Sequence, residues 1–300
     1  MRAGVDFGGT KIEAALLDSA GEIRVRERVA NPGDYAGAVR ATADLIARIE
    51  QQSGAGAKTI GVAMPGSLSP ASGRVRNANS TWLNGKPFLQ DLTQALNRPV
   101  RVENDANCFA LSEAVDGAGA GARVVFGCIF GTGCGGGLVV DGRIVEGANG
   151  IGGEWGHLPL PWPRADEAPA QHWCGRWGCI EQYLSGTGFK AWSGMSAKEA
   201  ADAAARGEAE GLVALDALSD RMARALALVI NICDPDVIVF GGGVSNVDWL
   251  YPAVRGKLIA HAFSDRIVTR VVKNKHGDSS GVRGAAWLFG ADGAESSLMQ

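Results

Sequence analysis

The sequence of 300 residues has no long run of lysine and arginine. Charged residues make up 20% of the chain, and the formal net charge is −3. Binding to DNA or RNA depends on a basic surface that neutralises phosphates, and nothing in this pattern supplies one. We therefore expect no nucleic-acid partner.

Long apolar runs are also missing. No stretch approaches the about 20 consecutive apolar residues that cross a bilayer. The first residues, MRAGVDFGGT, lack the apolar core of a secretory signal. These two absences predict a soluble, cytoplasmic protein without a membrane partner.

Cysteine is scarce, with six residues in the chain. That number is too small for a disulfide scaffold in a protein of this length. Four of the six lie in apolar or glycine-rich stretches and are predicted to be reduced and mostly buried: Cys108, Cys128, Cys134 and Cys233.

Glycine, in contrast, is abundant, with 43 residues that occur in clusters. Three clusters each follow an apolar stretch typical of a strand: Asp6, Gly8, Gly9, Thr10 and Lys11; the run Gly131 to Gly137, which contains Gly131, Thr132 and Gly133; and Gly241, Gly242 and Gly243. Backbone N–H groups in such turns can face phosphate oxygens, and Asp6 could hold Mg²⁺ directly or through water. Neither the Walker A nor the dinucleotide pattern is present. The set fits a nucleotide bound between two similar halves, although glycines that only permit tight packing would look the same.

The order of expected elements indicates an α/β protein, because strands and helices alternate. Strands are expected at 2–7, 12–17, 22–29, 59–64, 100–103, 123–130, 138–140, 143–145, 237–240 and 267–272, and helices at 36–52, 88–97, 107–118, 197–206, 211–232, 249–262 and 281–289. Both halves begin with a strand, a turn containing Gly and Thr, and a second strand, which is a weak internal repeat.

We predict two domains from this order. Residues 1–118, together with a closing helix at 281–290, form an N-terminal domain. Residues 119–280 form a C-terminal domain, and residues 291–300 form a tail.

Asn104 and Asp105 end an apolar strand in the run Val102-Glu103-Asn104-Asp105-Ala106-Asn107. A carboxylate beside carboxamides can hold a polyhydroxylated substrate and accept a proton from one hydroxyl. An Asp in such a turn can also be only a cap or a local hydrogen-bond acceptor, so this run needs support from elsewhere in the chain.

Four N and S ligands are spaced closely along the chain: His157, His172, Cys174 and Cys179. Imidazole and thiolate suit tetrahedral Zn²⁺, and with all four positions filled by protein the metal would be structural. The alternative is two free cysteines and two surface histidines. Glu154 and Glu181 flank this module and could be aimed at substrate hydroxyls.

Taken together, these segments resemble the ROK family of sugar kinases and repressors over nearly the whole chain. The matching segments are Asp6-Phe7-Gly8-Gly9-Thr10-Lys11, Glu103-Asn104-Asp105-Ala106-Asn107, Gly131-Thr132-Gly133, Glu154-Trp155-Gly156-His157, Cys174-Gly175-Arg176-Trp177-Gly178-Cys179-Ile180-Glu181 and Gly241-Gly242-Gly243. Residues 77–85 and 275–281 look most like bacterial fructokinases and mannokinases, with N-acetylglucosamine kinases as the nearest rivals. The family pattern has a cysteine where this chain has His172.

The resemblance implies a two-domain actin-like, hexokinase-like (ribonuclease H-like) ATPase fold with an interdomain cleft. The N-terminal domain would be the sugar and phosphate domain, and the C-terminal domain would contain the zinc module and the nucleotide-binding loops. It implies ATP-dependent phosphorylation of a hexose at the C6 hydroxyl, with fructose as the main expectation and mannose as a further substrate. N-acetylglucosamine kinase or glucokinase is the alternative. Asp105 would be the catalytic base, and the sugar would be bound by Gly66, Asn79, Asn104, Glu154, His157 and Glu181. Trp82, Asn84 and the His157 side of the pocket would distinguish among hexoses.

The same resemblance implies ATP, Mg²⁺ and a structural Zn²⁺ as cofactors and a homodimer as the assembly. A sugar-sensing repressor is the competing class. Repressors of this family carry a helix-turn-helix ahead of the Asp-x-Gly-Gly-Thr segment, and since Asp6 lies near the start of this sequence we expect a kinase and not a repressor.

Overall fold

The structure, a computed structural model, describes residues 1–167 and 169–290; the predicted tail at 291–300 lies outside the described residues. The chain divides into two compact units. Unit 1 contains Met1–Asp116, Glu146–Gly152 and residues 278–290, and unit 2 contains Gly117–Val145 and Gly153–Gly277. The α/β prediction is confirmed, while the functions assigned to the two domains stay predictions.

Unit 1 is built on a five-stranded sheet with the order β3-β2-β1-β4-β7. Its strands are β1 (Arg2–Phe7), β2 (Lys11–Leu17), β3 (Ile23–Ala30), β4 (Ile60–Met64) and β7 (Val100–Asn104), with a small separate pair β5 (Ser67–Leu68) and β6 (Val75–Arg76). β1, β2 and β3 form an antiparallel meander, and β4 and β7 continue the sheet in parallel with β1.

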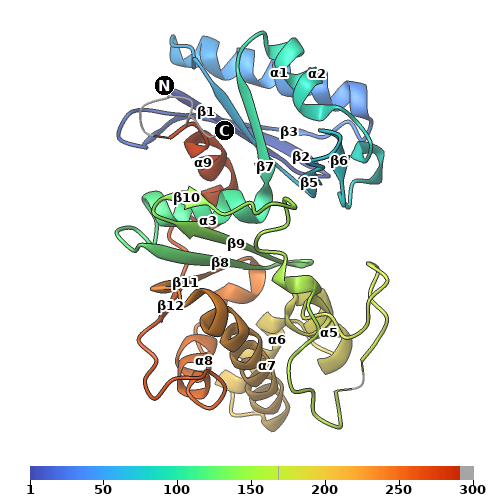
Figure 1. The fold of residues 1–300 in the computed structure, drawn as a ribbon, viewed down its shortest axis with the longest axis vertical. Coiled ribbons are helices and arrows are strands. Elements are labelled where there is room, and N and C mark those ends of the chain that lie inside the picture. The colour runs from blue at the N-terminus through green and yellow to red at the C-terminus, as the bar shows by residue number, and fades with distance from the viewer. Residues whose placement is uncertain (168, 291–300) are drawn as a thin grey trace. The chain divides into compact units, whose positions relative to one another are not determined.

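Helices cover both faces of this sheet (Figure 1). α1 (Tyr35–Ser53) and α2 (Phe88–Leu96) pack on one face, and α3 (Asp105–Val115) and α9 (Ser280–Trp287) pack together on the other. A Cβ at Gly61 of β4 would overlap the carbonyl of Ala285, so glycine at this position lets α9 lie directly on the sheet.

Unit 2 repeats this plan. Its sheet has the order β10-β9-β8-β11-β12, formed by β8 (Val124–Phe130), β9 (Cys134–Val140), β10 (Arg143–Ile144), β11 (Val237–Gly241) and β12 (Arg270–Lys273). The first three strands are antiparallel and the last two are parallel to β8, as in unit 1. The weak repeat in the sequence therefore corresponds to a repeated sheet topology.

The core of unit 2 is formed by its sheet and a group of helices. These are α4 (Glu181–Leu184), α5 (Gly186–Ser193), α6 (Ala197–Ala205), α7 (Ala209–Cys233) and α8 (Leu250–Leu258). α7 packs against α4, α6 and α8. The 3₁₀ turns among the described residues are η1 (Thr81–Leu83), η2 (Trp155–His157), η3 (Gly243–Asn246) and η4 (Gly277–Ser279). In the part of the chain that the structure describes, no helix has the length and apolar character to span a membrane.

Several boundaries differ from the expected ones. We predicted a turn over Gly131 to Gly137, but β9 begins at Cys134, so the last three glycines are strand residues paired with β8. Gly136 lies under a tryptophan, because a Cβ there would be 2.5 Å from Trp155 Cδ1. Glycine in this strand therefore serves packing, the alternative that we had left open. α3 begins at Asp105 rather than at Asn107, and α4 and α5 were not predicted.

Candidate functional site

Three predicted site segments share one edge of the unit 1 sheet. β1, β4 and β7 are parallel neighbours, and their register aligns Asp6 with Ala63 and Met64 with Asn104. The carboxyl ends of parallel strands meet at the same edge, which in open α/β sheets is where ligands bind. The turn after β1, Gly66 and Asp105 therefore lie along this edge.

The turn after β1 is narrow and internally bonded. The Gly8 N–H donates to the Lys11 carbonyl (3.0 Å), and the Asn31 side chain donates to the Gly8 carbonyl (2.8 Å). A Cβ on Gly9 would lie 2.9 Å from Ser80 Oγ, so this glycine is needed for the approach of the segment that follows Asn79. Burial, together with the nearby Glu13 carboxylate, raises the pKa of Asp6 to about 6.

Asp105 is the first residue of α3, and its side chain is exposed. The preceding Asn104 is the N-cap, since its Oδ1 accepts from the Ala106 and Asn107 N–H groups (2.9 and 3.3 Å). The Asn104 Nδ2 donates to the Gly66 carbonyl at 3.0 Å. Gly66 has φ +78°, and a Cβ there would be 2.7 Å from Ala78 N. A helix N-terminus favours a negative group, so Asp105 lies where its charge is stabilised.

Asn79 is exposed in the segment between β6 and η1. Asn84 fixes the shape of this segment by bonding both backbone groups of Ala78, accepting from its N–H (2.9 Å) and donating to its carbonyl (3.0 Å). Trp82 packs edge-on against Phe7 with 6.2 Å between ring centroids. The two residues that we expected to select among hexoses thus also organise the Asn79 segment.

Glu103 is a charged group to which we had given no role. It accepts hydrogen bonds from the Asn104 N–H (2.7 Å) and from Asn107 Nδ2 (3.0 Å), directly beneath the Asp105 turn. Burial and the neighbouring Glu146 raise the pKa of Glu103 to about 7, against the lowering effect of those two donors. No sequence signal marks the Glu103–Glu146 pair, because Glu146 joins unit 1 only through the tertiary fold.

The other two glycine loops lie against each other in unit 2. Gly131–Gly133 follows β8 and Gly241–Gly243 follows the parallel neighbour β11. Gly242 has φ +79°, and a Cβ there would be 2.5 Å from the Phe130 carbonyl oxygen and 2.9 Å from Gly131 N. The Gly131 carbonyl accepts from the Gly186 N–H at the start of α5 (2.7 Å). Two of the three predicted phosphate loops are therefore adjacent in space.

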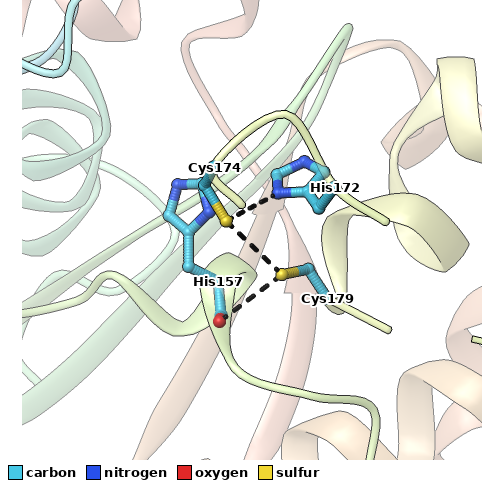
Figure 2. A group of neighbouring side chains, drawn as sticks. All are labelled: His157, His172, Cys174 and Cys179. Carbon is cyan, nitrogen blue, oxygen red and sulfur yellow. Dashed lines mark hydrogen bonds between the residues drawn. The ribbon is translucent and has the colours of Figure 1, made fainter. Parts of the chain in front are cut away.

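The four predicted metal ligands also converge in unit 2. One ligand atom from each of His157, His172, Cys174 and Cys179 lies within 4.8 Å of all the others. Figure 2 shows the two sulfur atoms facing each other, with the His172 ring turned towards Cys174. The measured separations are 3.7 Å between the Cys174 and Cys179 Sγ atoms and 3.1 Å between His172 Nδ1 and Cys174 Sγ.

These residues fit a tetrahedral zinc ion. Zn–S bonds of about 2.3 Å place two thiolates of a tetrahedron roughly 3.8 Å apart, close to the 3.7 Å observed. His157 Nδ1 is buried and has no hydrogen-bond partner among the described residues. A bond to a metal ion would satisfy this nitrogen. Burial raises the pKa of Cys174, but hydrogen bonds from His172 and the Arg176 backbone outweigh this and lower it to about 6.

Each histidine of this cluster has a predicted sugar-binding carboxylate beside its other ring nitrogen. His157 Nε2 lies 3.8 Å from Glu154 Oε2, and His172 Nε2 lies 2.7 Å from Glu181 Oε1. Burial by itself would raise the pKa of Glu181, but hydrogen bonds from the Cys134 N–H, Trp173 and His172 keep it below its usual value. Glu154, His157 and Glu181 are thus tied to the metal cluster within unit 2.

Comparison with known proteins identifies the family of this chain. Residues 2–292 match the ROK family. The N-acetyl-D-glucosamine kinase of Haemophilus influenzae is 39% identical, with 96% of this chain and 99% of that protein covered. The enzyme of the same name from Vibrio cholerae is 40% identical, with the same coverage.

Solved structures give the same family. A ROK hexokinase from Thermus thermophilus superposes with a TM-score of 0.84 at 28% identity, covering 95% of this chain and 96% of that one. A ROK glucokinase from Streptomyces griseus, solved with glucose and AMPPNP, has a TM-score of 0.77 at 27% identity, covering 96% and 98%. The chain therefore belongs to the ROK family, as a sugar kinase with the two-domain actin-like, hexokinase-like fold.

Proposed function

We propose that this protein transfers the γ-phosphoryl group of ATP to the C6 hydroxyl of N-acetyl-D-glucosamine. The observation that carries the choice of sugar is the identity of 39–40%, over nearly the full length, to relatives named N-acetyl-D-glucosamine kinases. Fructose, our main expectation from the sequence, has no such support, and the alternative that we had ranked second agrees better with these relatives.

In this proposal Asp105 is the catalytic residue. Asp105 aligns the C6 hydroxyl and accepts its proton while the oxygen forms a bond to the γ-phosphorus and the bond to the β-phosphate oxygen breaks, leaving ADP. The transition state is loose, so the proton moves late and alignment is the larger contribution. Exposure of Asp105 at the start of α3 supports this role.

The nucleotide is assigned to the glycine loops. The N–H groups of Gly8 and Gly131 are bonded within their own turns, so other backbone N–H groups of Gly8–Thr10, Gly131–Gly133 and Gly241–Gly243 would face the phosphates, with Lys11 and Thr132 as further donors. Asp6 is the proposed holder of the Mg²⁺ that accompanies ATP, which would offset charge on the transferring phosphate. The contact of Gly242 with Phe130 and Gly131 supports joint action of the last two loops.

The sugar hydroxyls are assigned to Gly66, Asn79, Asn104, Glu154, His157 and Glu181. Each buried polar group that a substrate leaves unpaired costs binding energy, so these residues would set specificity. Zinc, held by the four-residue cluster, would be structural and would orient His157. Assembly as a homodimer also stays a prediction.

A coupled assay of ADP release with N-acetylglucosamine, glucose, mannose and fructose tests the proposal. We expect the highest kcat/KM for N-acetylglucosamine. A higher value for fructose would restore the fructokinase interpretation. Sugar binding without turnover of any sugar would indicate a sensor instead of an enzyme.

A further inference from the structure

His172 faces two different groups with its two ring nitrogens. Nδ1 lies 3.1 Å from Cys174 Sγ, inside the metal cluster, and Nε2 lies 2.7 Å from Glu181 Oε1. The side chain is only 6% exposed, so neither contact is in competition with much water.

The Glu181 carboxylate is held on both oxygens. Oε1 accepts from His172 Nε2 and from Trp173 Nε1 (2.8 Å), and Oε2 accepts from the Cys134 N–H at the start of β9 (2.8 Å). Trp173 is 67% exposed, which leaves His172 as the buried side-chain donor. A Cβ on Gly133 would lie 2.6 Å from Oε2, so the fit around this oxygen is tight.

A cysteine at position 172 could serve the metal but could not make the second contact. Cysteine has one polar atom, whereas a neutral imidazole that binds a metal through one nitrogen carries its proton on the other. With Nδ1 directed at the cluster, Nε2 is therefore the donor to Glu181. A carboxylate on the far nitrogen of a metal-bound histidine fixes both the tautomer and the ring orientation.

We propose that His172 is a positioning residue for the sugar site: it holds Glu181 in its binding orientation while its other nitrogen serves the metal cluster. Metal occupancy and sugar affinity are thus linked in this chain through a contact that the cysteine of the usual family pattern does not offer. The inference rests on the proposed function, in which Glu181 contacts the sugar.

Two substitutions at this position separate the two contacts. His172→Cys keeps a metal ligand and removes the donor to Glu181. His172→Gln places an amide nitrogen near the Nε2 position, so it keeps a donor to Glu181 and removes the metal-binding nitrogen. For each purified protein, zinc content is measured by mass spectrometry, zinc affinity by chelator competition, and the Kd for N-acetylglucosamine by calorimetry without ATP.

We expect His172→Cys to retain zinc and to bind the sugar about 10-fold or more weakly, the typical effect of losing a hydrogen bond to a charged group. His172→Gln should lose zinc to chelators more readily and, in excess zinc, bind the sugar better than His172→Cys does. A His172→Cys protein with full zinc and an unchanged sugar Kd would overturn the proposal.

If the variants fold poorly, a measurement on the unsubstituted protein tests which nitrogen of His172 binds the metal. Long-range ¹⁵N NMR of the zinc-loaded protein should show His172 protonated on Nε2 and bound through Nδ1, and the reverse tautomer would overturn the proposal. If the unsubstituted protein binds no N-acetylglucosamine, the proposed function is wrong for that sugar. The same titrations are then run with the hexose that is turned over, and the tautomer and zinc results are unaffected.

Discussion

The Asn104 side-chain nitrogen lies 3.0 Å from the Gly66 carbonyl oxygen, which ties the N-terminus of α3 to the turn after β4. The Asn104 side-chain oxygen caps α3 at the same time. The carboxamide that we had assigned to the sugar thus has a structural task as well, and it fixes the backbone that carries Asp105.

Replacing Asn104 by Ala should therefore lower the free energy of unfolding by about 1–3 kcal/mol, the sum of a lost N-cap and a lost hydrogen bond. Asn104→Ser retains a capping oxygen but does not reach Gly66, so it should lose only about 1 kcal/mol. Urea unfolding of both variants measures the difference. Equal losses would show that the cap contributes nothing here.

Asp105→Asn should reduce kcat by about 10²–10⁴-fold, because the amide can no longer accept the hydroxyl proton. The KM for sugar should change little, since the amide still fits the site. Asp44→Asn is the matched control, because it alters an exposed carboxylate on a different helix, α1, and it should leave kcat unchanged. If kcat of the Asp105 variant stays near that of the control, this carboxylate is not the base.

Zinc removal should weaken sugar binding, since His157 belongs to the ligand cluster and is proposed to contact the sugar. Cys174→Ala should lower bound zinc and raise the Kd for sugar. Cys233→Ala, at a half-buried cysteine of α7 that is not a member of the cluster, should change neither. Activity that is unchanged after complete zinc removal would refute a role for the metal in this site.

The buried ion-pair network around Glu167 should contribute strongly to stability at neutral pH. Glu167 Oε1 accepts from Arg221 Nε at 2.8 Å and also pairs with Arg224, which bonds Asp220 at 3.0 Å. Removing one member of a buried pair costs about 3–5 kcal/mol, so Glu167→Gln should destabilise by that order. Glu208→Gln breaks an exposed pair with Arg206 that solvent screens, and it should leave the free energy of unfolding nearly unchanged.

The destabilisation caused by Glu167→Gln should depend on pH. Burial by itself would raise the pKa of Glu167, but hydrogen bonds from Arg224, the Arg164 backbone and Arg221 lower it from 4.5 to about 2. The stabilisation by the ionised form is complete above the unfolded value and is lost as the pH falls through the folded value. The difference between the unsubstituted protein and Glu167→Gln should therefore shrink between pH 4.5 and about pH 2. A constant difference over that range would contradict the assigned pKa.

Glu103 should give the stability a pH dependence of the opposite sign, in a higher pH range. Its pKa rises from 4.5 to about 7 on folding, so the folded state holds the proton more tightly and this contribution to stability is lost as the pH rises from 4.5 to about 7. Glu103→Gln keeps an acceptor for Asn104 and Asn107 but does not titrate. Its unfolding free energy should change less over this range, and a curve parallel to that of the unsubstituted protein would exclude Glu103 as the source.

Much of the fold could be predicted from local patterns. The stretch before the Gly8-Gly9 turn was predicted as a strand with the bounds that β1 has, and the turn glycines marked where it ends. The failures have physical causes. Gly135–Gly137 look like a loop because glycine favours turns, yet cross-strand pairing with β8 and the ring of Trp155 require small residues in a strand. α4 and α5 are only four and eight residues long, which is too few turns for a helical period to be recognised in the sequence.

By itself the sequence determined the family, the α/β class and the chemical types available to the site, because these depend on residue identity and short spacing. Tertiary structure alone decided which groups meet. Contacts between distant residues depend on how strands and loops pack, and spacing along the chain does not predict them. Examples are the contacts of Glu103 with Glu146, of Gly242 with Gly131, and of His172 with both Cys174 and Glu181. The histidine in place of a cysteine could be read from the sequence; that its second nitrogen reaches a carboxylate could not.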